Sequence, residues 1–194
     1  MKKVFAAYYD SLMKPLEKKL ITSWRKELLT EAKGEVLEIG AGTGINFPFY
    51  RNCTVTALEP NPHMVVKSKK RRSEAKVPIT IVGGVGEQLP FQEEQFDTVV
   101  ITLVLCSVQN QEQTLSEVKR VIKPGGKILF LEHVRMEQPF FSGLQNILNP
   151  FWRRVCDGCQ LNRNTEQSIV SSGIHITSKK SYLGGFAISV VAQK

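Results

Sequence analysis

Long apolar runs, a secretory leader and abundant cysteine are all missing from this sequence. No run reaches the length of a membrane span, and the segment 1–10 lacks the apolar core of a signal peptide. We therefore expect a cytoplasmic protein. The four cysteines are expected to be reduced thiols, because a disulfide framework is typical of secreted chains.

Internal repeats and low-complexity tracts are absent as well, and the composition is not that of a disordered chain. Hydrophobic residues make up 42% of the sequence and charged residues 23%, the usual balance of a soluble globular protein. A chain of 194 residues is long enough to bury roughly 70% of its unfolded surface without disulfides or metals. We expect a single domain over residues 1–194.

Acidic residues are fewer than basic ones, 18 against 26, which gives a formal net charge of +8. Much of the excess lies in KSKKRR, residues 67–72. We interpret this block as the solvated last turns of a helix, where cations also suit the helix dipole. Contact with nucleic acid or with an anionic membrane surface is the alternative. No aromatic residue interleaves with the block to stack on bases, which disfavours nucleic acid.

A glycine-rich loop, EVLEIGAGTGIN, follows the first apolar run. The run 36–39 predicts a buried parallel strand, and the glycines behind it allow a tight turn and a close approach of the backbone to a ligand. They are Gly40, Gly42 and Gly44. The next apolar run ends in Glu59, a carboxylate that can accept both hydroxyls of a ribose. The pattern predicts a nucleotide-type site; a plain strand-to-helix turn is the alternative, since the glycine spacing is not that of the dinucleotide fingerprint.

Strand and helix patterns alternate along the rest of the chain. We expect strands at 53–58, 78–82, 96–105 and 127–132, and a closing antiparallel pair at 174–181 and 186–192. Helices are expected at 8–30, 45–51, 111–122 and 165–172, with one more capped by Asn61. This alternation predicts an α/β fold with a parallel, doubly wound sheet. Ligands bind such a sheet at the carboxyl ends of its strands.

Several motifs resemble those of class I methyltransferases that use S-adenosylmethionine (SAM). They are the glycine loop with Glu38 before it and Glu59 after the next strand, GGVGEQLPF at 83–91, and RVIKPGGKI at 120–128. The resemblance implies a Rossmann-like, seven-stranded, mostly parallel sheet in the order 3-2-1-4-5-7-6, with the last strand antiparallel. It also implies SAM as the cofactor and a helical lid over residues 1–30, whose Tyr8 or Tyr9 touches the cofactor or only packs the helix.

The same resemblance carries over a set of cofactor-binding residues. The glycine loop backs the amino acid part of SAM, and Glu59 holds the ribose. One departure stands at Val85, where the family usually has an aspartate that accepts from the adenine amino group. Gly86 or Glu87 must then supply that contact. The expected set is Glu38, Gly40, Ala41, Gly42, Gly44, Glu59, Pro60, Gly86, Glu87 and Leu103.

Four further segments resemble the methyltransferase-like 7 group, whose animal members are membrane-associated alkyl thiol S-methyltransferases. They are TLVLCSVQNQE at 102–112, LEHV at 131–134, NILNPFW at 146–152 and DGCQLNR at 157–163. The animal proteins carry a hydrophobic N-terminal anchor that we do not find here, so only peripheral membrane contact stays open. The resemblance implies methylation of a small-molecule acceptor, with a thiol as one candidate. A lipid or quinone-like oxygen or nitrogen acceptor, and a SAM-binding protein without activity, are the alternatives.

A thiol acceptor needs little catalytic help, because a thiolate is already strongly nucleophilic. His133, Asp157 and Arg163 are the candidates for a nearby base or cation, although His133 is equally suited to a backbone hydrogen bond and Asp157 to capping a turn. The segment 146–163 is expected to overhang the strand ends. Its Phe151 and Trp152 are predicted to form an apolar roof over the acceptor, or else to be core residues.

A metal site is not expected from the sequence. Cys156 and Cys159 form a C-x-x-C pair, but structural zinc needs four ligands and no second close pair completes the set. Nucleic-acid methylation is also disfavoured, because the N-P-P-Y type motif of base methyltransferases is absent after the fourth expected strand, where the chain has LVLCS.

Overall fold

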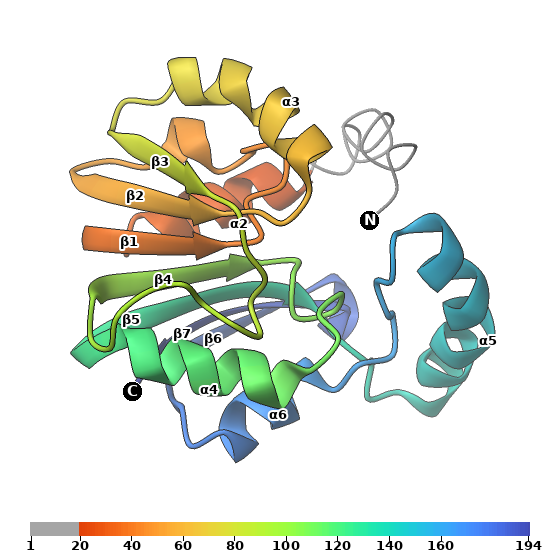
Figure 1. The fold of residues 1–194 in the computed structure, drawn as a ribbon. Coiled ribbons are helices and arrows are strands. Elements are labelled where there is room, and N and C mark those ends of the chain that lie inside the picture. Colours follow the sequence, from red (N-terminus) through yellow and green to blue (C-terminus); the bar gives the residue numbers. More distant parts are fainter. Residues whose placement is uncertain (1–19) are drawn as a thin grey trace.

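The computed structural model describes residues 20–194. Most of the expected N-terminal helix, with Tyr8 and Tyr9, lies outside the described residues. Within the described part, a helix covers Thr22–Leu29 and is labelled α2 (Figure 1). No helix of this part is long and apolar enough to cross a membrane.

A seven-stranded sheet forms the centre of the molecule, in the order β3-β2-β1-β4-β5-β7-β6. The first five strands of this order run parallel, and β7 is antiparallel to both of its neighbours. The expected strand order is therefore confirmed. The strands are β1 Gly34–Ile39, β2 Cys53–Leu58, β3 Ile79–Val82, β4 Phe96–Thr102, β5 Ile122–His133, β6 His175–Tyr182 and β7 Ala187–Gln193.

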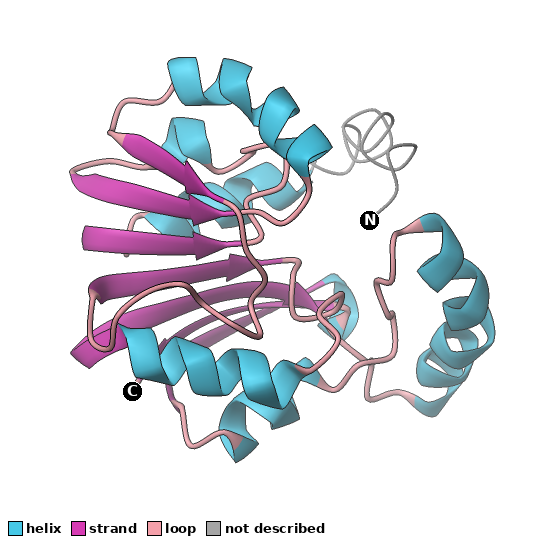
Figure 2. Ribbon diagram, viewed as in Figure 1, coloured by secondary structure: helices cyan, strands magenta, loops and turns pink. Residues whose placement is uncertain are grey.

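Helices cover both faces of this sheet (Figure 2). Besides α2 they are α3 Pro62–Ser73, α4 Gln111–Val121, α5 Pro139–Val155 and α6 Thr165–Ser171, with short 3-10 turns at η2 Phe47–Phe49 and η3 Leu183–Gly185. Leu115 of α4 and Ile169 of α6 belong to one buried apolar cluster. Leu28 of α2 and Phe47 of η2 belong to a second one. The sheet is thus doubly wound, with α4 and α6 on one face and α2 and η2 on the other.

Local signals explain why several elements begin where they do. The Asn61 side chain accepts a hydrogen bond from the His63 N–H, and Pro62 occupies the first turn of α3, as the sequence predicts. Asn110 caps α4 in the same way through the Gln113 N–H. Basic residues fill the last turn of α3, which accounts for most of the KSKKRR block.

Three expected elements differ from the observed ones. The segment 45–51 forms only the 3-10 turn η2, since Pro48 removes a backbone donor and Phe47 and Tyr50 are both fully buried there. Strand β4 ends at Thr102 rather than at residue 105, because Leu103 takes a left-handed φ of 57°. Strand β5 begins at Ile122, before the KPGG segment, and its pairing with β4 is irregular there.

Figure 1 shows α5 beyond the carboxyl ends of the parallel strands, apart from the two helical layers. Its attachment to the domain is polar. Gln145 of α5 donates to the carbonyls of Val134 and Leu161 and accepts from the Met136 N–H. The segment around α5 therefore overhangs the edge of the sheet where ligands bind in this fold.

Candidate cofactor and acceptor sites

The glycine loop after β1 is held tightly at its ends and is open in its middle. A Cβ at Gly40 would lie 2.5 Å from Val104 Cγ2, and one at Gly44 would lie 2.6 Å from the Phe47 ring. At Gly42 the nearest atom would be the Gly40 carbonyl oxygen, 4.0 Å away. The Gly40 and Ala41 N–H groups both donate to the Leu58 carbonyl, at 2.8 and 3.0 Å. Packing fixes this loop beside the end of β2 and leaves its middle accessible to a ligand.

Glu59 sits directly after β2 and faces the glycine loop. Its two carboxylate oxygens accept from the Gly42 N–H and the Asn61 N–H, each at 2.8 Å. Burial raises the pKa of Glu59, and the nearby negative charge of Asp157 adds to this shift. Each carboxylate oxygen has two lone-pair sites, so a ribose hydroxyl can still bind beside these backbone donors. Pro60, the next residue, is exposed.

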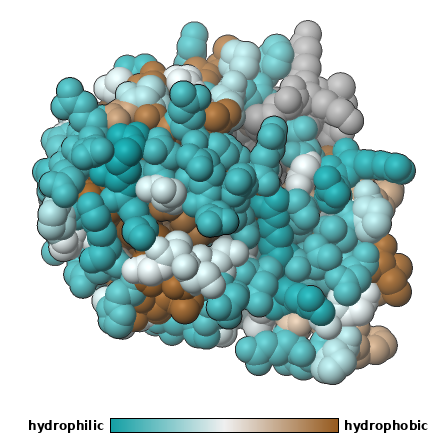
Figure 3. Space-filling view, turned by 60° about the horizontal axis from the view of Figure 1, so that its bottom comes forward, coloured by the Kyte–Doolittle hydropathy of each residue, from teal (hydrophilic) through white to brown (hydrophobic). Residues whose placement is uncertain are grey.

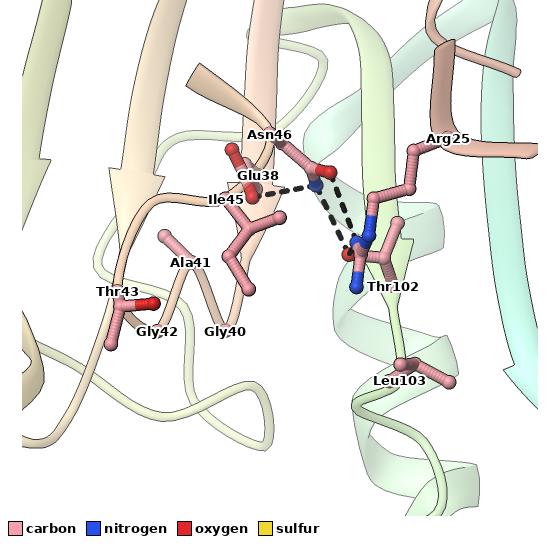
Figure 4. A pocket seen from close by; sticks show the side chains of 10 residues that line it. All are labelled: Arg25, Glu38, Gly40, Ala41, Gly42, Thr43, Ile45, Asn46, Thr102 and Leu103. Atoms are coloured by element: carbon pink, nitrogen blue, oxygen red, sulfur yellow. Dashed lines mark hydrogen bonds between the residues drawn. The ribbon is translucent and has the colours of Figure 1, made fainter. Parts of the chain in front are cut away.

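A small pocket of about 50 Å³, partly open to solvent, lies beside the glycine loop (Figure 4). It is lined by residues of α2, β1, the glycine loop and the end of β4. They are Arg25, Glu38, Gly40, Ala41, Gly42, Thr43, Ile45, Asn46, Thr102 and Leu103. This set includes five of the expected cofactor-binding residues, which the fold brings together from both sides of the sheet's switch point between β1 and β4.

A hydrogen-bonded chain of side chains forms one wall of the pocket. Arg25 donates to Asn46 at 3.0 Å and to Thr102 at 2.9 Å, and Asn46 donates to Glu38 at 2.9 Å. The Tyr50 hydroxyl donates to the other Glu38 oxygen at 3.0 Å. Burial raises the pKa of Glu38 to about 7, although these hydrogen bonds oppose the shift. Glu38 therefore lines the pocket while its carboxylate is already engaged.

Arg25 is a pocket residue that the sequence did not reveal. It is 3% exposed on the apolar face of α2, and its partners lie 21 and 77 positions away. The one available signal was a cation on the inward face of an amphipathic helix, where a buried charge needs partners.

Leu103 and Glu132 shape the loop that follows β4. Leu103 holds a φ of 57° and donates its N–H to the Leu131 carbonyl at 2.7 Å. Glu132, on β5, accepts the N–H groups of Val104 and Leu105 at 2.8 and 3.0 Å. Burial raises the pKa of Glu132 to about 7. This fully buried acid holds the loop in place, and sequence reasoning missed it inside the LEHV motif.

On the expected adenine side, Gly86 packs against α4 and Glu87 is engaged with the backbone. A Cβ at Gly86 would come within 3.0 Å of Thr114 Cγ2. One Glu87 oxygen accepts the N–H groups of Gln109 and Asn110, at 2.7 and 3.3 Å. Val85 is 45% exposed at the turn. The adenine contacts expected of Gly86 and Glu87 stay predictions.

His133 lies at the end of β5 and contacts a cysteine instead of the backbone. Its Nε2 lies 3.0 Å from Cys159 Sγ, and Cys159 Sγ lies 3.6 Å from Cys106 Sγ. The Trp152 indole N–H donates to Cys159 Sγ at 3.3 Å. The hydrogen bonds from Cys106 and His133 lower the pKa of Cys159 to about 4. Burial alone would lower the pKa of His133, but the Cys159 sulfur raises it overall.

Asp157 is not part of this group. It has a left-handed φ of 49°, and its buried Oδ2 has no hydrogen-bond partner among residues 20–194. Its negative charge adds to the raised pKa of Glu59. A role as a base stays a prediction.

The expected apolar roof does not include Phe151, which is 68% exposed to solvent. Trp152 does reach inward, since it donates to Cys159. The two residues are neighbours on α5 and point in different directions, as successive helical positions must. Cys159 lies with Cys106 and His133, two residues that are distant in the sequence, and not only with its C-x-x-C neighbour Cys156.

The residues present fit SAM. The open middle of the glycine loop suits a closely approaching ligand, and Glu59 offers a buried carboxylate at the tip of β2. The adjoining pocket is polar where Asn46 and Arg25 lie. These features suit the charged amino acid part and the ribose of the cofactor.

Known proteins resemble the chain over most of its length. The methyltransferase domain family matches residues 37–130. Thiol S-methyltransferase TMT1B of Homo sapiens is 35% identical over 178 residues, which cover 84% of this chain and 72% of that protein. TMT1A of Homo sapiens is 35% identical over 170 residues, covering 85% and 70%. A solved SAM-dependent methyltransferase of Thermotoga maritima superposes with a TM-score of 0.71 at 19% identity and covers 100% of both chains.

The solved structure shows the fold alone, whereas the human proteins are similar enough in sequence and in coverage to show the family. The fold, the glycine loop and Glu59 after β2 agree with membership in this family. The chain belongs to the class I SAM-dependent methyltransferases, in the group that includes the thiol S-methyltransferases, and transfers a methyl group to a small-molecule acceptor.

Proposed function

We propose that this enzyme methylates the sulfur of a small thiol, with SAM as the methyl donor. The observation that carries the proposal is the 35% identity to two proteins named thiol S-methyltransferases, over more than four-fifths of this chain. The arrangement of the described residues is consistent with it. Methyl transfer to a thiolate needs positioning and exclusion of water more than acid–base catalysis.

Bound SAM supplies the electrophilic methyl group, so the tasks of this chain are to bind and to orient. Glu59 and the open face of the glycine loop would hold the ribose and the amino acid part. Glu132 fixes the loop that carries Leu103, at the boundary between the cofactor pocket and the acceptor side. Trp152 excludes water on the acceptor side and keeps Cys159 in place.

Acceptor chemistry is tested with labelled SAM and pairs of substrates that differ only in sulfur or oxygen. With an alkyl thiol, turnover should rise with pH as the fraction of thiolate increases. The alcohol of the same shape should be nearly inert, because its oxygen stays protonated throughout this range. Equal turnover of the thiol and the alcohol would contradict a thiol acceptor.

A lipid or quinone-like oxygen or nitrogen acceptor is the second candidate, and the outer surface of α5 favours it. Apolar side chains of this helix face solvent, with Phe140 77% exposed, Ile147 76% and Phe151 68%. Figure 3 shows brown, hydrophobic side chains at the right-hand edge of the molecule, which α5 forms. We assign this surface to peripheral contact with an anionic membrane, because Arg153 and Arg154 flank it in the last turn. An acceptor dissolved in the membrane would be delivered there.

A further inference from the structure

Two sulfurs and one imidazole nitrogen meet where the ends of β4 and β5 approach the turn after α5. Cys106 Sγ, the His133 ring nitrogen and Cys159 Sγ all lie within 4.8 Å of one another. They come from three different segments, namely the loop after β4, the end of β5 and the turn after α5. Cys106 is 1% exposed and His133 is 8% exposed, so the group is shielded from solvent.

The distances suit tetrahedral zinc coordination. Zn–S bonds of about 2.3 Å and Zn–N bonds of about 2.0 Å place two ligand sulfurs roughly 3.8 Å apart and a sulfur and a nitrogen roughly 3.6 Å apart. The two sulfurs here are 3.6 Å apart, and the Cys159–His133 pair is 3.0 Å apart. His133 would need to draw back from Cys159 by about half an ångström, and Cys106 and His133, which lie within 4.8 Å of each other, would close around the ion by side-chain rotation.

The surroundings support such a site. The Trp152 N–H already donates to Cys159 Sγ, an orienting contact of the kind that surrounds metal ligands. The His133 ring stacks on Phe186 with centroids 5.8 Å apart, so apolar surface encloses the imidazole. The Gln160 N–H donates to the Cys106 carbonyl at 2.9 Å and fixes the turn that carries Cys159 against the loop of Cys106.

We propose that Cys106, His133 and Cys159 bind one Zn²⁺ ion whose fourth coordination position takes the sulfur of the acceptor thiol. No other cysteine, histidine, aspartate or glutamate of residues 20–194 joins this group. Two cysteines and one histidine with an open fourth position are a ligand set found in catalytic zinc sites, whereas structural zinc sites are closed by four protein ligands. The part of the inference in which the acceptor sulfur binds the zinc ion rests on the proposed thiol methylation.

The loop that carries Cys106 also reaches the cofactor pocket. Leu103 lines that pocket and stands three residues before Cys106 on the same loop. Asp157, which stands two residues before Cys159, carries a negative charge that adds to the raised pKa of Glu59.

Coordination would supply the thiolate that methyl transfer needs. When the thiol binds, a Zn–S bond forms and the S–H proton leaves to water, because a coordinated thiol is deprotonated. The acceptor sulfur then forms a bond to the methyl carbon as the bond from that carbon to the donor sulfur breaks. The bonding electron pair stays with the donor sulfur and neutralises its positive charge. The thioether product is a weaker ligand than the thiolate and leaves the site.

Metal binding is tested first, without reference to activity. The purified protein, stripped of metal and kept reduced, is titrated with Co²⁺, and Zn²⁺ content is measured separately. One Co²⁺ per chain should bind and give the thiolate charge-transfer band and the visible absorption of a tetrahedral site, and Zn²⁺ should displace it. Cys106→Ser and Cys159→Ser should each weaken zinc binding by more than about a hundredfold.

Cys156→Ser is the matched control, because Cys156 stands three residues from Cys159 and is not in the group. It should bind Co²⁺ as the parent does. Absence of a tetrahedral spectrum in the reduced parent would overturn the site, and so would equal losses in Cys156→Ser and Cys159→Ser. A Cys106–Cys159 disulfide that forms readily in air while the reduced protein ignores both metals would also overturn it.

The acceptor's role is tested on the Co²⁺ form. An added alkyl thiol should change the charge-transfer band, while its alcohol analogue should leave the spectrum unchanged. Thiol methylation should fall at least tenfold in the metal-free protein while SAM affinity is kept. Full thiol methylation without metal would overturn this inference and leave the proposed function intact. Absence of thiol methylation in every form would defeat the proposed function, whatever the cobalt spectrum shows.

Discussion

Glu59 is the residue at which cofactor binding is tested most directly. Glu59→Ala removes a charged acceptor of the ribose hydroxyls, so SAM affinity should fall by roughly tenfold to a hundredfold, or about 1.5 to 3 kcal/mol. Calorimetric titration measures the change. The control is Asn61→Ala, which loses the cap of α3 and should lower the melting temperature while SAM affinity stays near that of the parent. Parental affinity in Glu59→Ala would remove Glu59 from the site.

Glu38 predicts a pH dependence of stability. Its pKa rises from 4.5 to about 7 in the folded protein because of burial. The folded state therefore holds this proton more tightly than the unfolded state, and stability is lost as pH rises from about 4.5 to about 7. Glu38→Gln has no such titration. Between pH 5 and pH 8 the free energy of unfolding of the parent should fall relative to the variant, by up to about 3 kcal/mol.

Denaturant unfolding of both proteins at the two pH values gives this difference. Glu35→Gln, which changes an exposed carboxylate of the same strand, serves as the control. A gap between parent and Glu38→Gln that stays constant from pH 5 to pH 8 would show that Glu38 is ionised in the folded protein throughout.

Among the elements, α5 differs from an ordinary surface helix because its polar side buries against the domain and its apolar side faces solvent. Its buried residues are Ser142 and Gln145, and large apolar residues face outward. Exposed apolar surface of this kind usually marks a contact site. The double variant Phe140→Ser with Ile147→Ser should lose most binding to vesicles that contain phosphatidylglycerol, as measured by sedimentation, and should keep its melting temperature because neither side chain is buried.

Val170→Ser is the matched control, since Val170 is a 52% exposed apolar residue on α6, outside the α5 surface. It should bind vesicles as the parent does. Vesicle binding that the α5 substitutions leave unchanged would reject the membrane as the contact. A dimer that forms through α5, seen by ultracentrifugation, would reject it as well.

For the whole molecule, one sheet and two apolar clusters on its faces predict a single cooperative unit. Thermal unfolding should show one transition. SAM at about a hundred times its dissociation constant should stabilise the folded state by about 2.7 kcal/mol, which raises the melting temperature by roughly 5 to 11 °C for a chain of this size. Scanning calorimetry with and without SAM measures both. Two separate transitions, of which SAM shifts only one, would contradict a single domain over 1–194.

The order of strands and helices followed from the sequence, because hydrophobic periodicity and turn residues act over a few positions. The buried runs at 36–39 and 53–58, the Asn61 cap and the glycine loop are all local signals. The family motifs added the sheet order. Element ends were less predictable, as Leu103 shows, since its left-handed φ depends on contacts with β5.

Contacts between distant segments were decided by the tertiary structure alone. Arg25 reaches Thr102 across 77 positions, and Cys106 meets Cys159 across 53. The pattern C-x-x-C couples Cys159 with Cys156, whereas packing puts Cys159 beside His133 and Cys106. The sequence by itself determined the sheet, the glycine loop and the acid at its side, because those depend on local propensity and on strand order. Which polar side chains share a pocket depends on how the helices pack on the sheet, and only the tertiary structure specifies this packing.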